Sequence, residues 1–146
     1  PCNGVIHAKE IVDTDYSVLN HYQVVQKGSG TAVVALGDFF QLGEKVAAAI
    51  GKKTGITPTL INPRYITGLD EVLLKQLTED HAFVVTLEDG ILNGGFGEKI
   101  ARFYGPSNMK VFNYGLKKEF LDRYAVEDVL RDNHLTPELI LQDLGF

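Results

Sequence analysis

The first residues whose types could do chemistry are an adjacent pair of carboxylates. Glu88 and Asp89 directly follow the apolar run 83–87, at the end of a predicted strand, where α/β proteins place functional groups. Such carboxylates can hold Mg²⁺ or exchange protons. Neighbouring residues of one strand point to opposite faces, however, so the pair is poorly placed to converge on one ion. We therefore expect helix capping or an interface hydrogen bond.

A glycine-rich stretch follows the acidic pair. Gly94, Gly95 and Gly97 lie where a predicted helix begins after a strand. Free N–H groups at a helix start can bind an anion, and glycine also lets another surface approach closely. Because Glu88 and Asp89 would repel an anion, the sequence favours tight helix–sheet or subunit packing over a phosphate site.

The other polar residues form no catalytic set. The 4 histidines are scattered without the paired spacing of a zinc site. No serine lies in a Gly-x-Ser-x-Gly elbow, so a hydrolase triad has no nucleophile. Arg64 is the remaining polar candidate, and we expect it to form a structural salt bridge. We predict no catalytic, cofactor-binding or metal-binding residue in this chain.

Composition narrows the class of protein. The length of 146 residues suits a single core. A net charge of -5 without a basic cluster disfavours nucleic-acid binding, and the apolar runs are too short for a membrane span. The single cysteine, Cys2, allows no internal disulfide and fits a cytoplasmic setting. The chain opens on Pro1 and has its only methionine at Met109, so we expect it to be part of a longer protein.

The elements that must position these residues alternate between strand and helix. We expect strands at 31–36, 59–61, 83–87 and 110–114, and helices at about 38–53, 70–79, 97–103, 118–123, 126–132 and 137–143. Asp38 is expected to cap the first helix and Gly55 to end it. The second helix is expected to bury a stripe formed by Leu69, Val72, Leu73 and Leu77.

This alternation predicts a three-layer αβα domain with a mostly parallel, five-stranded sheet. The segment 21–26 precedes a turn too tight for a crossover, so we expect one antiparallel edge strand there. Residues 1–20 show no clear period and are expected to be a linker or arm, and residues 21–146 to be the domain itself.

Two segments resemble the carboxy-terminal domain of the transketolase superfamily. The segment 86–100 has that domain's order of apolar strand, acidic pair, short loop and Gly-Gly-x-Gly at a helix start. The segment 61–70 is similar to its N-x-R-x-(I/V)-x-P-L-D stretch, with Gly68 in place of the usual proline. Within the superfamily, 114–120 and 126–140 are similar to the end of 1-deoxy-D-xylulose-5-phosphate synthases, with Lys117-Lys118 replacing Pro-Asp. The resemblance covers about Gly28 to Leu144.

The resemblance implies a parent enzyme whose thiamine diphosphate and Mg²⁺ are held by two upstream domains. The synthases it resembles condense pyruvate with glyceraldehyde 3-phosphate and release CO₂, opening the non-mevalonate isoprenoid route. It further implies contacts with the upstream domains of the same chain, a homodimer of the parent and no activity of this domain alone. Gly37-Asp38-Phe39 with Asn62 mimics the family's Gly-Asp-Gly…Asn diphosphate motif. Phe39 would block the diphosphate, and the region lies in the wrong domain.

Other functions stay open at this point. The chain could be the end of a transketolase, or of the β subunit of a 2-oxoacid dehydrogenase. It could also be a stand-alone module that uses the helix start at Gly94–Gly97 to bind a phosphometabolite.

Overall fold

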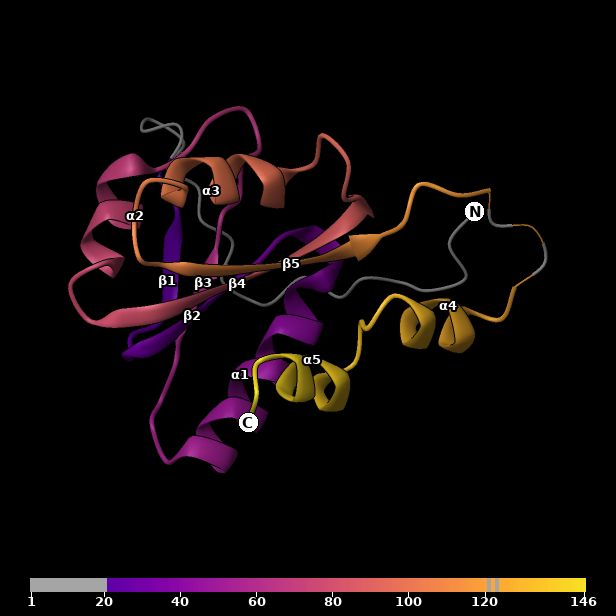
Figure 1. The fold of residues 1–146 in the computed structure, drawn as a ribbon, viewed down its shortest axis with the longest axis horizontal. Coiled ribbons are helices and arrows are strands. Elements are labelled where there is room, and N and C mark those ends of the chain that lie inside the picture. The colour runs from indigo at the N-terminus through magenta and orange to yellow at the C-terminus, as the bar shows by residue number, and fades with distance from the viewer. Residues whose placement is uncertain (1–20, 121, 123) are drawn as a thin grey trace, which may run out of the picture.

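The computed structural model describes residues 21–120, 122 and 124–146, so the predicted arm at 1–20 lies outside the described residues. Figure 1 shows a central sheet with helices on both of its faces. The strands are β1 (Gln23–Gln26), β2 (Gly30–Ala35), β3 (Thr59–Asn62), β4 (His81–Ile91) and β5 (Lys110–Leu116). The helices are the 3₁₀ turn η1 (Gly37–Phe39), α1 (Phe40–Thr54), α2 (Glu71–Leu77), α3 (Phe96–Tyr104), α4 (Val126–Asp132) and α5 (Pro137–Asp143).

The five strands lie in the order β1-β3-β2-β4-β5. β2 pairs in parallel with β3 and β4, and β4 pairs in parallel with β5. β1 pairs antiparallel with β3 at the edge of the sheet, with Gln23 opposite Asn62. The predicted fold class, a mostly parallel sheet with one antiparallel edge strand, is confirmed.

Each face of the sheet carries its own apolar core. Because β2 is central and covered on both faces, its residues 31–35 are all buried. On one face α1 and α5 pack against Val33, Val85 and Leu87. On the other face α2 and α3 pack against Val34 and Val84, closing the second core.

Local rules explain where the first two helices end and begin. Gly55 ends α1 in the left-handed conformation, with φ 75°, and its N–H donates to the carbonyl of Gly51. Asp70 caps α2, since its side chain accepts a hydrogen bond from the N–H of Leu73. The capping role predicted for Asp38 is wrong, because η1 intervenes and α1 starts after Phe39 without a side-chain cap.

Two further expectations are corrected in the middle of the chain. β4 continues to Ile91 instead of ending at position 87, because Ile91 still pairs with Leu116 of β5. In α2, Val72 is 66% exposed whereas Leu74 is fully buried. Leu74 and Leu77 are the residues of α2 that are buried in the core against the sheet.

The helix predicted at 118–123 is absent from the described residues of that segment. Phe120 has no neighbour to bury it there and is fully exposed. A helix this short is marginal without a buried face. Instead, Lys117 is tied to the end of α4, with its N–H donating to Asn133 Oδ1 (2.9 Å) and its Nζ to the carbonyl of Asp132 (2.9 Å).

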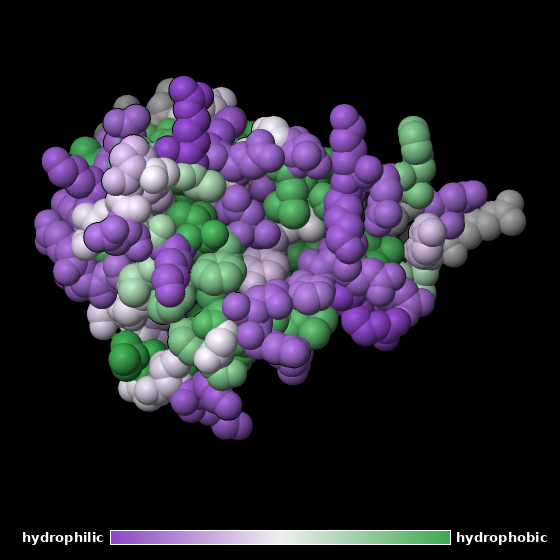
Figure 2. All heavy atoms as spheres, in the orientation of Figure 1, coloured by the Kyte–Doolittle hydropathy of each residue, from purple (hydrophilic) through white to green (hydrophobic). Residues whose placement is uncertain are grey.

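Among the described residues, no helix is both long and apolar enough to cross a membrane. Figure 2 shows mainly hydrophilic side chains on the visible face, with apolar groups between them.

Candidate functional site

The end of β4 and the start of α3 are joined by one buried carboxylate. Glu88 is only 5% exposed. Its Oε2 accepts a hydrogen bond from the N–H of Phe96 (2.7 Å), and its Oε1 accepts one from the N–H of Gly97 (2.9 Å). The carboxylate therefore caps α3 from a neighbouring strand and places a negative charge at the positive end of the helix. Asp89 is exposed, as expected for the next residue along a strand.

Gly95 and Gly97 make this close approach possible. A Cβ atom at Gly95 would lie 2.5 Å from Glu88 Oε2. At Gly97 it would lie 2.5 Å from Thr86 Oγ1 and 2.9 Å from the Asn113 side chain. Thr86 and Asn113 are themselves joined, since Thr86 Oγ1 donates to Asn113 Oδ1 (2.8 Å). Any side chain at either glycine would push α3 away from the sheet.

Gly94 has a different role from its neighbours. Its φ of 76° lies in the left-handed region, and a Cβ there would meet nothing within 4 Å. Its N–H donates to Glu98 Oε2 (2.8 Å), which closes the turn before the helix.

The described residues do not fit a diphosphate or its metal ion at this helix start. The N–H groups of Phe96 and Gly97 are taken by Glu88, and the N–H of Gly95 donates to the carbonyl of Leu92 (2.9 Å). An incoming phosphate would have to displace a buried carboxylate of its own charge. No group of three His, Cys, Asp or Glu side chains in the described part of the chain could hold a metal ion.

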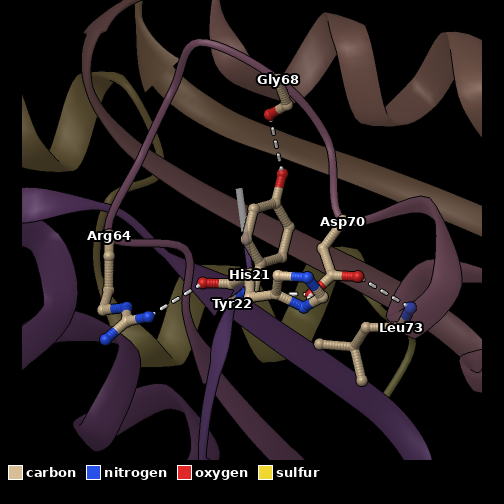
Figure 3. A network of polar contacts seen from close by, with 6 residues as sticks. All are labelled: His21, Tyr22, Arg64, Gly68, Asp70 and Leu73. Carbon is tan, nitrogen blue, oxygen red and sulfur yellow. Dashed lines mark hydrogen bonds and ion pairs between the residues drawn. The ribbon is translucent and has the colours of Figure 1, made fainter. Parts of the chain in front are cut away.

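A second polar network holds the loop that follows β3 (Figure 3). The N–H of Tyr22 donates to Asp70 Oδ2 (3.0 Å), and the Tyr22 hydroxyl donates to the carbonyl of Gly68 (3.3 Å). Burial raises the pKa of Tyr22 to about 12, so its hydroxyl keeps the proton that it donates. Asp70 therefore fixes both the start of α2 and the entry of the chain into β1.

Arg64 lies in this loop with a strained backbone. Its φ is 60°, in the left-handed region that residues other than glycine seldom adopt. Its N–H donates to Asn62 Oδ1 (3.1 Å), and its guanidinium donates to the carbonyl of His21 (3.3 Å) and lies 5.6 Å from the centre of the Tyr65 ring. These contacts tie the loop to the first described residues. The structural salt bridge expected of Arg64 stays a prediction.

The two networks meet at one end of the sheet. Lys99 of α3 donates through Nζ to the carbonyl of Ile66 (3.1 Å). The rings of Tyr22 and Phe96 lie 6.2 Å apart. The structure thus brings Glu88 together with Gly95 and Gly97, and places Arg64 in the neighbouring network. The interface role predicted for these residues stays a prediction.

The backbone strain at Arg64 can be measured with a matched pair of variants. Arg64→Gly and Arg64→Ala both remove the guanidinium, but only glycine adopts a φ of 60° without strain. We expect the glycine variant to be more stable than the alanine variant by about 1 kcal/mol in urea unfolding. Equal stabilities, or a more stable alanine variant, would contradict the strained conformation.

The sequence matches one protein family over most of its length. The family model "Transketolase, C-terminal domain" matches residues 20–140, and the chain belongs to this family. The predicted resemblance is confirmed.

Curated relatives of this chain include 1-deoxy-D-xylulose-5-phosphate synthases. The chain is 31% identical over 128 residues to the 1-deoxy-D-xylulose-5-phosphate synthase of Shouchella clausii (strain KSM-K16), covering 86% of this chain and 20% of the relative. It is 34% identical over 114 residues to the synthase of the same name from Leifsonia xyli subsp. xyli (strain CTCB07), covering 77% and 17%. The chain therefore spans about a fifth of the length of the curated relatives that it matches.

Solved structures share the fold. A split gene transketolase, described as an inactive beta4 tetramer, superposes with a TM-score of 0.74 at 20% identity, covering 86% of this chain and 41% of that chain. The transketolase of Campylobacter jejuni subsp. jejuni NCTC 11168 gives a TM-score of 0.57 at 15% identity, covering 86% and 18%. At these identities the likeness extends to the fold alone.

Proposed function

We propose that this chain is the carboxy-terminal domain of a thiamine-diphosphate-dependent 1-deoxy-D-xylulose-5-phosphate synthase. The parent enzyme condenses pyruvate with glyceraldehyde 3-phosphate to give deoxyxylulose 5-phosphate and CO₂. The observation that carries the proposal is the 31% identity to a synthase over 86% of this chain. The matched segment makes up only 20% of the length of that synthase. That share fits a terminal domain of a longer enzyme.

The domain itself has a structural and interface role. Thiamine diphosphate and Mg²⁺ are held by the upstream part of the parent, which works as a homodimer in the cytoplasm. The capping of α3 by Glu88 supports a structural role for this domain. The N–H groups of Phe96 and Gly97, which a diphosphate would need, already donate hydrogen bonds to Glu88. The domain alone is inactive.

The test is an assay of the complete polypeptide beside the 146-residue chain. We expect the complete polypeptide to release CO₂ from pyruvate only when glyceraldehyde 3-phosphate is present, and the 146-residue chain to release none. Turnover by the isolated chain would overturn the structural role. Transfer from a ketose donor instead of pyruvate would identify a transketolase.

A further screen separates the domain from a stand-alone binding module. We expect no phosphate ligand to raise the melting temperature of the 146-residue chain. A clear rise with one phosphate ligand would favour the module, because free N–H groups at a helix start bind anions.

A further inference from the structure

The exposed apolar side chains of this domain gather at the carboxyl ends of its parallel strands. Among the described residues, nine large apolar side chains are exposed, and six of them end a strand or lie in the segment that follows it: Ile66, Val72, Ile91, Phe120, Tyr124 and Val126. Single exposed apolar residues need no explanation, but a concentration at one edge indicates an interaction surface.

This edge is poorly covered by the domain's own elements. Phe120 is 101% exposed, and Val126 at the start of α4 is 68% exposed. α4 itself has no buried residue. Figure 1 shows α4 projecting from the body of the domain, beyond the arrowheads of β4 and β5. The segment after β5 therefore ends in apolar groups that the described part of the domain leaves uncovered.

The chain also enters the domain at this edge. β1 runs antiparallel to β3, so the amino end of β1 lies beside Asn62, at the carboxyl end of β3. There His21 is held through its carbonyl by Arg64, and the N–H of Tyr22 by Asp70 (Figure 3). The network thus fixes the point from which the preceding polypeptide extends.

We propose that this carboxyl edge docks against the part of the polypeptide that precedes the domain, with Ile66, Ile91 and Phe120 as its apolar contacts. The inference rests on the proposed function and adds the surface that the upstream domains cover. The occupant follows from the entry point of the chain and from the synthases, in which the matched segment is only 17–20% of the length. The closed cap at Glu88 also makes the edge unsuited to an anionic small molecule.

The test compares amide hydrogen exchange in the complete polypeptide with that in the 146-residue chain. We expect peptides covering 63–72 and 116–120 to exchange at least about tenfold more slowly in the complete polypeptide, because docking buries them. Peptides around Ile56, at the opposite edge, should exchange equally in both. This readout needs no enzyme activity, so its failure is distinct from failure of the proposed synthase function.

A matched pair of substitutions completes the test. Ile66 follows the carboxyl end of β3 and is 52% exposed, whereas Ile56 precedes the amino end of β3 and is 51% exposed. We expect Ile66→Asp to remove the protection in the complete polypeptide and Ile56→Asp to leave it, while neither shifts the melting temperature of the 146-residue chain. Phe120→Asp should act as Ile66→Asp does.

Two results would overturn the inference. One is equal exchange at 63–72 in both polypeptides. The other is a concentration-dependent dimer of the 146-residue chain that Ile66→Asp dissociates, since the occupant would then be a second copy.

Discussion

Replacing Glu88 by glutamine is expected to lower the free energy of unfolding by about 2–4 kcal/mol. The carboxylate is buried, and each of its oxygens accepts a hydrogen bond from a backbone N–H at the start of α3. Glutamine would keep one oxygen and turn an NH₂ group toward the other N–H, so two donors would face each other in a buried place. The negative charge at the positive end of the helix would also be lost. Urea unfolding followed by circular dichroism measures the change.

The adjacent acidic residue supplies the control for Glu88. Asp89 is exposed, so Asp89→Asn should change the free energy of unfolding by no more than about 0.5 kcal/mol. Both variants remove one negative charge, and their difference therefore isolates the buried cap from the net charge. Equal losses in the two variants would show that Glu88 does not hold α3.

Gly97→Ala is expected to lower the free energy of unfolding by about 2–4 kcal/mol. The new Cβ would lie 2.5 Å from Thr86 Oγ1 and 2.9 Å from Asn113 Oδ1, and these two groups are hydrogen-bonded to each other. Either that pair separates or α3 moves outward and lengthens the hydrogen bond between the Gly97 N–H and Glu88. Thermal and urea unfolding both measure the loss.

The matched control for Gly97 is a glycine at the other end of the same helix. At Gly105 a Cβ would meet the carbonyl of Arg102 at 3.4 Å, and the backbone there is right-handed helical. Gly105→Ala should therefore be neutral or stabilising by up to about 1 kcal/mol. If Gly97→Ala were tolerated as well as Gly105→Ala, the contact between α3 and the sheet would be looser than the structure indicates.

The fold could be predicted from the sequence because each central strand is a continuous apolar run between helical segments. The run at 31–35 is buried on both faces, as a parallel strand requires. The end of β4 could not be predicted in this way. Glu88, Asp89 and Gly90 have the composition of a loop and lie at an irregularity of the ladder, after which pairing resumes between Ile91 and Leu116 of β5. The composition of the segment after β5 permits a helix, but no described residue covers Phe120, and a helix there would have no buried face.

The residue types at the site indicate capping and close packing, but the sequence does not show which residues contact one another. Helix capping by the acidic pair and close packing at the glycines follow from residue type. That Glu88 is the capping residue, and that Gly97 lies over Thr86 and Asn113, depends on how α3 returns across the sheet. The hydrogen bond from the Tyr22 N–H to Asp70 joins residues 48 positions apart, so local sequence patterns do not predict it.

The central claim is that Glu88 closes the start of α3, so that this domain holds no diphosphate. Isothermal titration calorimetry of the 146-residue chain with thiamine diphosphate at millimolar concentration and Mg²⁺ tests it directly. The account predicts no heat beyond dilution. A stoichiometric heat of binding would contradict it.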